Sequence, residues 1–199
     1  NVVRFLYPPH PYMLNLCDGD GLLVMEEIPV GGVPGESLQK EYYQDLVTSY
    51  ARDMVDRDRH HVSVLAWGIG DELETANATD YVNATRNIIR SMDSRSVYFA
   101  SRALNDPAFE YVDLVAWNTY GSDAKETREA LKRYARGEKP VIIVRYGRDV
   151  EPGNHNGYSD PLSMESQARY SMQLFEVIRE QTIAGGILWS FNDWRTDRA

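Results

Sequence analysis

The sequence has almost no cysteine, no long apolar run and fewer basic than acidic residues. Its 199 residues include one cysteine, Cys17, which excludes an internal disulfide and a zinc site built from several cysteines. No apolar run approaches the roughly 18 residues of a membrane-spanning helix, so we expect no membrane partner. Lys and Arg number 21 against 30 Asp and Glu, which gives a formal net charge of −9. Because phosphate binding needs a basic face, we also expect no nucleic-acid partner.

Histidines at metal-ligand spacing are also absent. The four histidines, His10, His60, His61 and His155, do not recur in such a pattern, so we expect neither a metal nor a cofactor. Among the aromatic residues, 13 Tyr and 4 Trp outnumber 5 Phe. Rings with a polar edge stack on sugars, but they are equally typical of half-buried strands and interfaces. The aromatic count therefore leaves both interpretations open.

Short apolar runs alternate with helical stretches along the chain. The runs cover residues Val2–Leu6, Leu22–Val30, Val62–Ile69, Ser96–Ala100, Val112–Asn118, Val141–Tyr146 and Gly186–Phe191. Several are continuous, as in Leu22–Met25 and Val141–Val144. Continuous runs are typical of strands buried on both faces of a parallel sheet that helices cover.

Two of the helical stretches carry apolar residues about four positions apart, the spacing of a stripe that faces the core. The first, which Ser37 can cap, has a stripe of Leu38, Tyr42, Leu46, Tyr50 and Met54. The second has a stripe of Met164, Ala168, Met172 and Phe175, and it ends before Gly185-Gly186.

Seven runs with helices between them predict an α/β fold, a (β/α)8 TIM-type barrel with its parallel strands in sequence order. The chain begins on a strand and is shorter than the usual length of about 250 residues for such barrels. We therefore expect seven strands, without the first β/α unit. Residues 1–199 would then form one partial domain of a larger protein. An open, doubly wound sheet has the same local pattern and remains the alternative.

Polar residues gather where the apolar runs end. In a barrel, the carboxyl ends of the strands form the catalytic face. The residues at or near these ends are Arg4, Glu27, Asp71, Glu72, Asn118, Tyr120, Arg145 and Trp189. Any one of them could simply begin a solvated loop, but their recurrence at several strand ends indicates a site.

Several of these segments form longer motifs, which occur in a fixed order. They are Asn1–Arg4, Cys17–Pro29, His61–Glu72, Asp113–Tyr120, Lys139–Gly147 and Gly185–Asp193. In order and spacing they resemble strands two, three, four, six, seven and eight of the catalytic barrel of glycoside hydrolase family 2, the β-galactosidase, β-glucuronidase and β-mannosidase group. The family's first strand and its flanking β-sandwich domains have no counterpart here.

The resemblance implies a retaining hydrolase of O-glycosidic bonds in β-linked carbohydrates. That reaction uses two carboxylates about 5 Å apart, one as acid/base and one as nucleophile. Glu72 matches the acid/base position. Arg145 stands where the family has the nucleophilic glutamate of Glu-Tyr-Gly, and Asp71 stands where it has asparagine. Because arginine stays protonated and cannot attack an anomeric carbon, we expect the chain to be inactive by this mechanism.

The remaining matched positions imply a carbohydrate site. Arg4 matches an arginine that supports the nucleophile, and Glu27 is expected to help hold the site together. Asn118 and Tyr120 match the rim of the sixth strand, and Trp189 matches the aromatic platform under the sugar. The expected partners are therefore a carbohydrate and the missing flanking domains of the same protein.

Two alternatives to a family 2-type glycosidase domain stay open. In the first, the barrel binds carbohydrate or serves as a scaffold without catalysis. In the second, the enzyme is active with a relocated nucleophile or an inverting mechanism, and the candidate carboxylates are Glu27, Asp71 and Asp193. An inverting pair would need a separation of roughly 6.5–9.5 Å.

Overall fold

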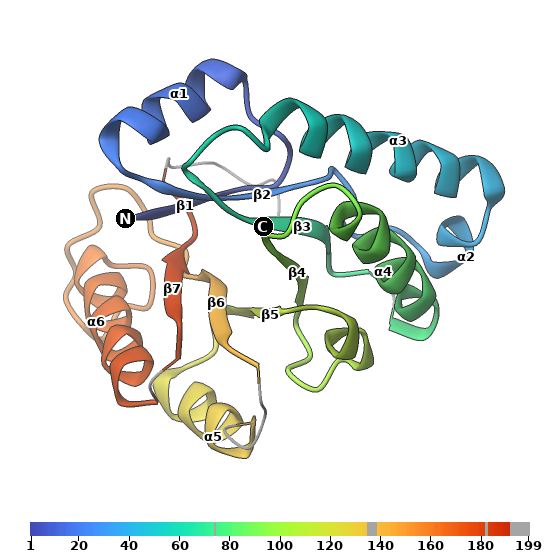
Figure 1. Ribbon diagram of the computed structural model, residues 1–199. Helices are drawn as coiled ribbons and strands as arrows, with labels where there is room; N and C mark the ends of the chain where they lie inside the picture. Colours follow the sequence, from blue (N-terminus) through green and yellow to red (C-terminus); the bar gives the residue numbers. More distant parts are fainter. Residues whose placement is uncertain (74, 135–138, 182, 192–199) are drawn as a thin grey trace. The chain divides into compact units, whose positions relative to one another are not determined.

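The computed structural model describes residues 1–73, 75–134, 139–181 and 183–191, with the backbone alone for residues 75–77. This part of the chain contains seven strands, each of which overlaps a predicted apolar run (Figure 1). They are β1 (Val2–Phe5), β2 (Leu23–Glu27), β3 (Val64–Asp71), β4 (Ser96–Ser101), β5 (Leu114–Tyr120), β6 (Val141–Tyr146) and β7 (Gly185–Leu188).

The strands form one sheet in sequence order, from β1 to β7. The pairs β1–β2, β2–β3, β3–β4, β4–β5 and β6–β7 are all parallel. This order confirms the α/β, TIM-type prediction with seven parallel strands. A doubly wound sheet reverses its strand order near the middle, so that alternative is wrong.

Two compact units make up the chain, and each is described by itself. The N-terminal unit comprises Asn1–Trp117 with Glu138–Val141, and the C-terminal unit comprises Asn118–Gly137 with Ile142–Ala199. The helices of the N-terminal unit are α1 (Pro11–Asp20), α2 (Gly35–Leu38), α3 (Glu41–Asp58), α4 (Thr75–Arg90) and the 3-10 helix η1 (Pro107–Tyr111). Those of the C-terminal unit are α5 (Ala124–Tyr134) and α6 (Met164–Glu180). No helix among the described residues is long and apolar enough to cross a membrane.

Local sequence explains where the helices begin and end. In α1 the side chain of His10 accepts a hydrogen bond from the backbone N–H of Tyr12, and Pro11 occupies the first turn, where its missing N–H costs nothing. Gly21 ends α1 in the left-handed conformation, at φ 69°. Ser163 caps α6 by accepting a hydrogen bond from Ser166 N–H.

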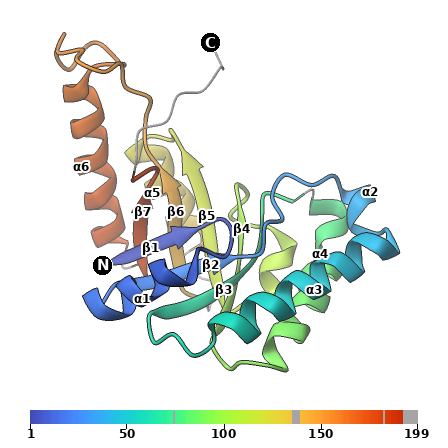
Figure 2. The same cartoon turned by 90° about the horizontal axis from the view of Figure 1, so that it is seen from above.

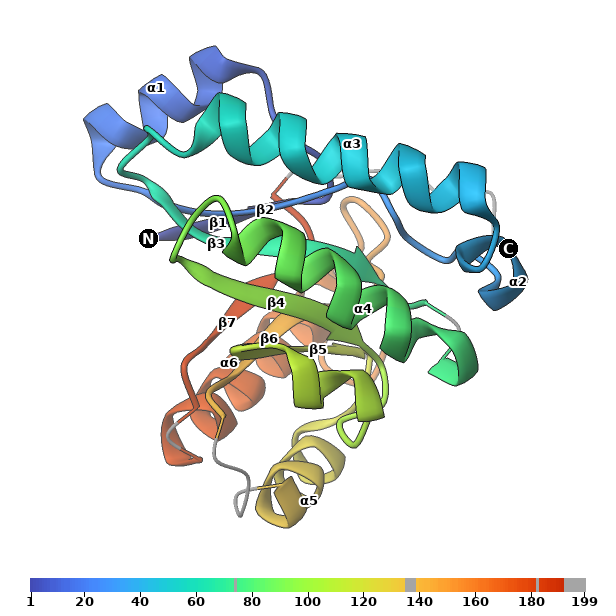
Figure 3. The same ribbon diagram turned by 45° about the vertical axis from the view of Figure 1, so that its right-hand side comes forward.

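Helices of the N-terminal unit cover its strands from outside. In Figures 1 and 3, α3 and α4 lie side by side over β3, and they contact each other and that strand. The largest fully buried side chains of this unit include Trp67, Tyr98 and Phe99. In the C-terminal unit, α5 lies beside α6, and α6 packs on β7 (Figure 2). An ion pair of 2.9 Å between Arg128 and Glu180 joins the two helices.

The predicted buried stripe of the helix after Ser37 is wrong for its three middle residues, whereas Leu38 and Met54 are buried as predicted. This stretch forms two helices, and α3 begins at Glu41 without a side-chain cap. Tyr42, Leu46 and Tyr50 are 65%, 42% and 41% exposed. The face that packs on the sheet is the neighbouring stripe of Val47, Ala51, Met54, Val55 and Asp58. The helix carries two stripes, and the one with the smaller side chains packs inside.

The predicted stripe of the last helix is also wrong. Met164, Met172 and Phe175 are 44%, 67% and 54% exposed. The buried residues of α6 are Ser166, Tyr170, Leu174, Val177 and Ile178. The Tyr170 hydroxyl donates a hydrogen bond of 2.9 Å to the Tyr120 backbone oxygen, which fixes this buried face toward the end of β5.

Candidate functional site

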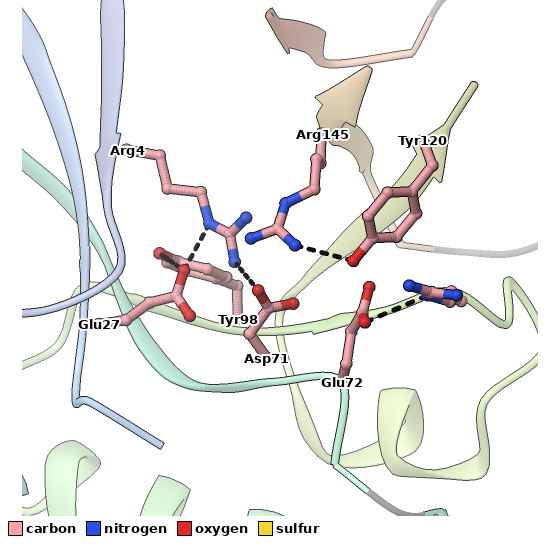
Figure 4. Close-up of polar contacts among 8 residues, drawn as sticks. Arg4, Glu27, Asp71, Glu72, Tyr98, Tyr120 and Arg145 are labelled. Carbon is pink, nitrogen blue, oxygen red and sulfur yellow. Dashed lines mark hydrogen bonds and ion pairs between the residues drawn. The ribbon is translucent and has the colours of Figure 1, made fainter. Parts of the chain in front are cut away.

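Arg4, on β1, is the centre of a buried polar cluster in the N-terminal unit (Figure 4). Its Nε donates a hydrogen bond to Glu27 Oε1, and its Nη2 lies 3.5 Å from Asp71 Oδ2. The Tyr98 hydroxyl, from β4, donates to the same Glu27 oxygen at 3.0 Å. The side chains of Arg4 and Glu27 are only 2% and 1% exposed. Four adjacent strands therefore bury the Arg4–Glu27 ion pair almost completely, beside Asp71, whose side chain is 12% exposed.

A glycine makes room for this cluster. Glu27 pairs with Gly68 across β2 and β3. A Cβ on Gly68 would lie 2.0 Å from Glu27 Cγ and 2.7 Å from the Tyr98 hydroxyl oxygen. The absence of a side chain at Gly68 therefore leaves the space that the Glu27 and Tyr98 side chains occupy.

Burial and charge set the ionisation of the cluster. Burial raises the pKa of Glu27 to about 7, against the lowering effect of Arg4, while Asp71 adds to the rise. Burial also raises the pKa of Tyr98 well above its usual value, so its hydroxyl keeps the proton that it donates to Glu27. For Arg4, burial acts against the charged form, but Glu27, Tyr98 and Asp71 outweigh it and raise its pKa. The guanidinium therefore stays charged while Glu27 titrates near neutral pH.

Glu72 follows Asp71 at the end of β3 and points to a different cation. Its Oε2 lies 3.1 Å from Nε of Arg102, and the two side chains are 23% and 64% exposed. Glu72 has φ 53°, and its backbone N–H donates to the Ala100 oxygen at 2.8 Å. Its side chain is therefore partly exposed, at the end of a strand.

In the C-terminal unit, Arg145 of β6 lies against two aromatic rings. Its Nη1 donates a hydrogen bond of 2.8 Å to the Tyr120 hydroxyl. The guanidinium carbon lies 5.3 Å from the centre of the Tyr120 ring and 4.2 Å from the centre of the Trp189 ring. These are cation–π distances. Asn118, also predicted for the site, is buried on β5.

Backbone strain also marks two of the predicted positions. Among the described residues other than glycine, Glu72 and Tyr120 alone have positive φ, at 53° and 51°. Such conformations cost of order 1–3 kcal/mol each and cluster at functional sites. Both residues lie at the carboxyl ends of strands, where the sequence predicted the site.

The structure thus brings the predicted residues together in two groups. Arg4, Glu27 and Asp71 form one group in the N-terminal unit, and Tyr120, Arg145 and Trp189 form another in the C-terminal unit. The convergence of both groups with Glu72 at one rim stays a prediction. No group of three or more potential metal ligands occurs among the described residues.

Sequence analysis missed two residues of these clusters. Tyr98 lies inside an apolar run, where a tyrosine is indistinguishable from a core residue. Arg102 directly follows β4, but the predicted run ended at Ala100, so its strand-end position escaped notice. Of the alternative carboxylates, Glu27 is enclosed and bound to Arg4, which does not suit a water-activating base, and Asp193 lies outside the described residues.

Comparison with known proteins agrees with the in-order parallel sheet. The chain matches the family described as glycosyl hydrolases family 2, TIM barrel domain, over residues 1–199. It is 27% identical over 213 residues to the β-glucuronidase of Mus musculus, covering 97% of this chain and 33% of that protein. It is 25% identical over 227 residues to the β-glucuronidase of Streptococcus agalactiae serotype V, and the match covers 96% of this chain and 38% of that protein. The chain therefore spans about a third of the length of these relatives.

Among solved structures, the fold is similar to that of Bifidobacterium dentium β-glucuronidase complexed with coumarin-3-O-glucuronide. The TM-score is 0.90 at 24% identity, over 98% of this chain and 35% of that one. A GH2 β-galacturonidase from Eisenbergiella tayi bound to galacturonate gives a TM-score of 0.87 at 23% identity, over 96% and 37%. Since the family match covers every residue of the sequence, the chain belongs to glycosyl hydrolase family 2, as a TIM-barrel domain.

Proposed function

We propose that this domain binds β-linked carbohydrate at the carboxyl ends of its strands and does not perform retaining hydrolysis. The observation that carries the proposal is the sequence Arg145-Tyr146-Gly147 at the end of β6, where the family resemblance places Glu-Tyr-Gly. A guanidinium stays protonated and has no lone pair to attack an anomeric carbon. The double displacement therefore lacks its nucleophile.

Neighbouring residues on β6 do not replace the missing carboxylate. Val144 and Tyr146 flank Arg145, and strand alternation turns both away from its direction. The Arg145 guanidinium is itself engaged by the Tyr120 hydroxyl and the Trp189 ring. These contacts stabilise arginine at the position where the reaction needs an anion.

The other strand-end groups suit sugar binding. Glu72 is a partly exposed carboxylate that would accept hydrogen bonds from sugar hydroxyls, and Trp189 offers an aromatic ring on which a pyranose can stack. The buried Arg4–Glu27 pair would hold Asp71 in place within the N-terminal unit. Since the relatives are β-glucuronidases, β-glucuronides are the first ligands to test. The flanking domains expected in a larger protein would complete the specificity.

Two measurements test the proposal. The first incubates the protein with the 2-deoxy-2-fluoro β-glycosyl fluorides of glucuronic acid, galactose and mannose, followed by intact-mass measurement. We expect no covalent adduct, and an adduct on any carboxylate of this chain would show that a nucleophile is present. The second measures binding of the corresponding methyl β-glycosides by calorimetry.

For the binding measurement, Trp189→Ala is compared with Tyr158→Ala. Tyr158 is a 59% exposed aromatic residue that, like Trp189, stacks on an arginine, Arg169, at 5.0 Å. We expect Trp189→Ala to lose binding and Tyr158→Ala to keep it. Equal binding by all three proteins would exclude Trp189 from the site, and no binding by the wild type would favour a purely structural domain.

A further inference from the structure

The Trp189 ring, the predicted sugar platform, carries a side chain of the same unit on its face. The Arg145 guanidinium carbon lies 4.2 Å from the ring centre. Figure 4 shows the same guanidinium directed at the Tyr120 hydroxyl, to which Nη1 donates at 2.8 Å. The Tyr120 hydroxyl and the two aromatic rings thus hold Arg145 in place.

The backbone fixes this arrangement. The Trp189 N–H donates to the Tyr146 oxygen at 2.8 Å, so β7 and the residue after it stay in register with β6. On the other side, the Thr119 hydroxyl donates to the Arg145 backbone oxygen at 3.2 Å. Both the cation and the ring it covers are therefore anchored at their own backbones, and their contact is a built feature of the C-terminal unit.

A group that stacks on an aromatic ring occupies the space above the ring at about the distance that separates Arg145 from Trp189. Aromatic partners stack at centre distances of roughly 4.5 Å and above, and cations within about 6 Å. A guanidinium at 4.2 Å is at contact distance. A pyranose and the guanidinium consequently cannot lie on the same face of Trp189 together.

We infer that Arg145 is an autoinhibitory, affinity-limiting residue that occupies the Trp189 face and must move aside before a saccharide can stack there. The inference rests on the proposed carbohydrate binding and adds a second role for Arg145, beyond the loss of the nucleophile. A ligand that enters must break the Arg145–Trp189 contact and displace the hydrogen bond to Tyr120. Removing the arginine side chain therefore increases affinity.

The ligand that tests this inference most directly carries no charge. With methyl β-D-galactopyranoside, the loss of a positive charge does not by itself change the attraction between protein and ligand. Binding is measured by calorimetry for the wild type, Arg145→Ala, Arg145→Lys and the double variant Arg145→Ala/Trp189→Ala. Arg169→Ala is the matched control, because Arg169 stacks on Tyr158 at 5.0 Å in the same unit. Near-UV circular dichroism and thermal unfolding confirm that each variant is folded.

We expect Arg145→Ala to bind the neutral probe roughly 2- to 30-fold more tightly than the wild type, the range that loss of a cation–π contact allows. Arg145→Lys, which lacks the planar guanidinium, should have an affinity between those of Arg145→Ala and the wild type. Arg169→Ala should bind as tightly as the wild type. The double variant Arg145→Ala/Trp189→Ala should lose the increase in affinity. Acrylamide quenching of tryptophan fluorescence should rise in Arg145→Ala, and this rise should be absent when Trp189 is also replaced by Phe.

Several results would overturn the inference. Affinity in Arg145→Ala that equals or falls below that of the wild type shows that Arg145 does not restrict binding. If the wild type nevertheless binds and Trp189→Ala does not, the proposed function stands and only the autoinhibition fails. If no variant binds the galactoside or methyl β-D-glucuronide, both the inference and the proposed function fail.

Discussion

Glu26 and Glu27 follow one another on β2, and both are buried, on opposite faces of the sheet. Glu27 contacts Arg4 and Tyr98 in the candidate site. Glu26 instead interacts with the fully buried Asp58 of α3, which helps to raise the pKa of Glu26. Because side chains alternate along a strand, β2 supplies one acid, Glu27, to the candidate site and a second acid, Glu26, to the layer between the sheet and α3.

Glu26→Gln should make stability less dependent on pH. Burial and then Asp58 raise the pKa of Glu26 to about 8, against the lowering effect of Arg57 and Arg95. The folded state therefore holds a proton that the unfolded chain releases, so the free energy of unfolding falls as pH rises from the usual carboxyl range to pH 8. Relative to the wild type, the variant should gain of order 2–4 kcal/mol between pH 4 and pH 9.

Urea unfolding at pH 4, 5, 7 and 9 measures this difference. Glu176→Gln serves as the control, because Glu176 is exposed on α6 and should follow the wild-type profile. A Glu26→Gln variant whose difference from the wild type is the same at every pH would show that the pKa of Glu26 does not change on folding.

Arg4→Met should destabilise the protein more as pH rises. Arg4 lowers the pKa of Glu27, so its loss leaves Glu27 and Asp71 as buried acids without their cation. At pH 5 Glu27 is protonated in both proteins and the cost is smaller. At pH 8 we expect a loss of about 3 kcal/mol in the free energy of unfolding. Equal losses at pH 5 and pH 8, measured by urea unfolding, would mean that packing alone explains the role of Arg4.

Gly68→Ala should displace the Glu27 and Tyr98 side chains of the candidate site and lower the free energy of unfolding. The added Cβ would lie 2.0 Å from Glu27 Cγ, so Glu27 and Tyr98 must shift. Overpacking of this kind costs about 1–3 kcal/mol, measured by thermal or urea unfolding. Gly19→Ala in α1 is the control, since nothing lies within 4 Å of its Cβ. We expect that change to be neutral or stabilising by roughly 0.5–1 kcal/mol.

The sequence predicted the strands well because their signal is local. In a continuous apolar run, neighbouring side chains point to opposite faces of the sheet, so both faces must be covered. The structure buries all four residues of the run Val141–Val144 on β6. Strand order followed from the same pattern once the runs alternated with helices. The strand-end residues were predicted for the same reason, since a polar residue after an apolar run marks where the strand leaves the core.

Helix faces and partners across strands could not be predicted in this way. On α3, the stripes that begin at Leu46 and Val47 have similar spacing, and only the packing against the sheet decides which is buried. Tyr98 contacts Glu27 from a strand 71 positions away in sequence. Such contacts depend on register and on the space left by Gly68, which no single-sequence pattern contains.

Restoring a carboxylate at position 145 should restore the first half of the retaining reaction. In Arg145→Glu the strand end reads as in the family, and a 2-deoxy-2-fluoro glycosyl fluoride provides a leaving group that needs no protonation by Glu72. We expect a covalent adduct that maps to position 145 and forms slowly, because the family resemblance predicts asparagine at the position of Asp71. Arg145→Gln, which has no carboxylate, should give none, as should the wild type. Intact-mass measurement followed by peptide mapping decides the matter: if Arg145→Glu remains unmodified while it still binds the sugar, position 145 is not the nucleophile position.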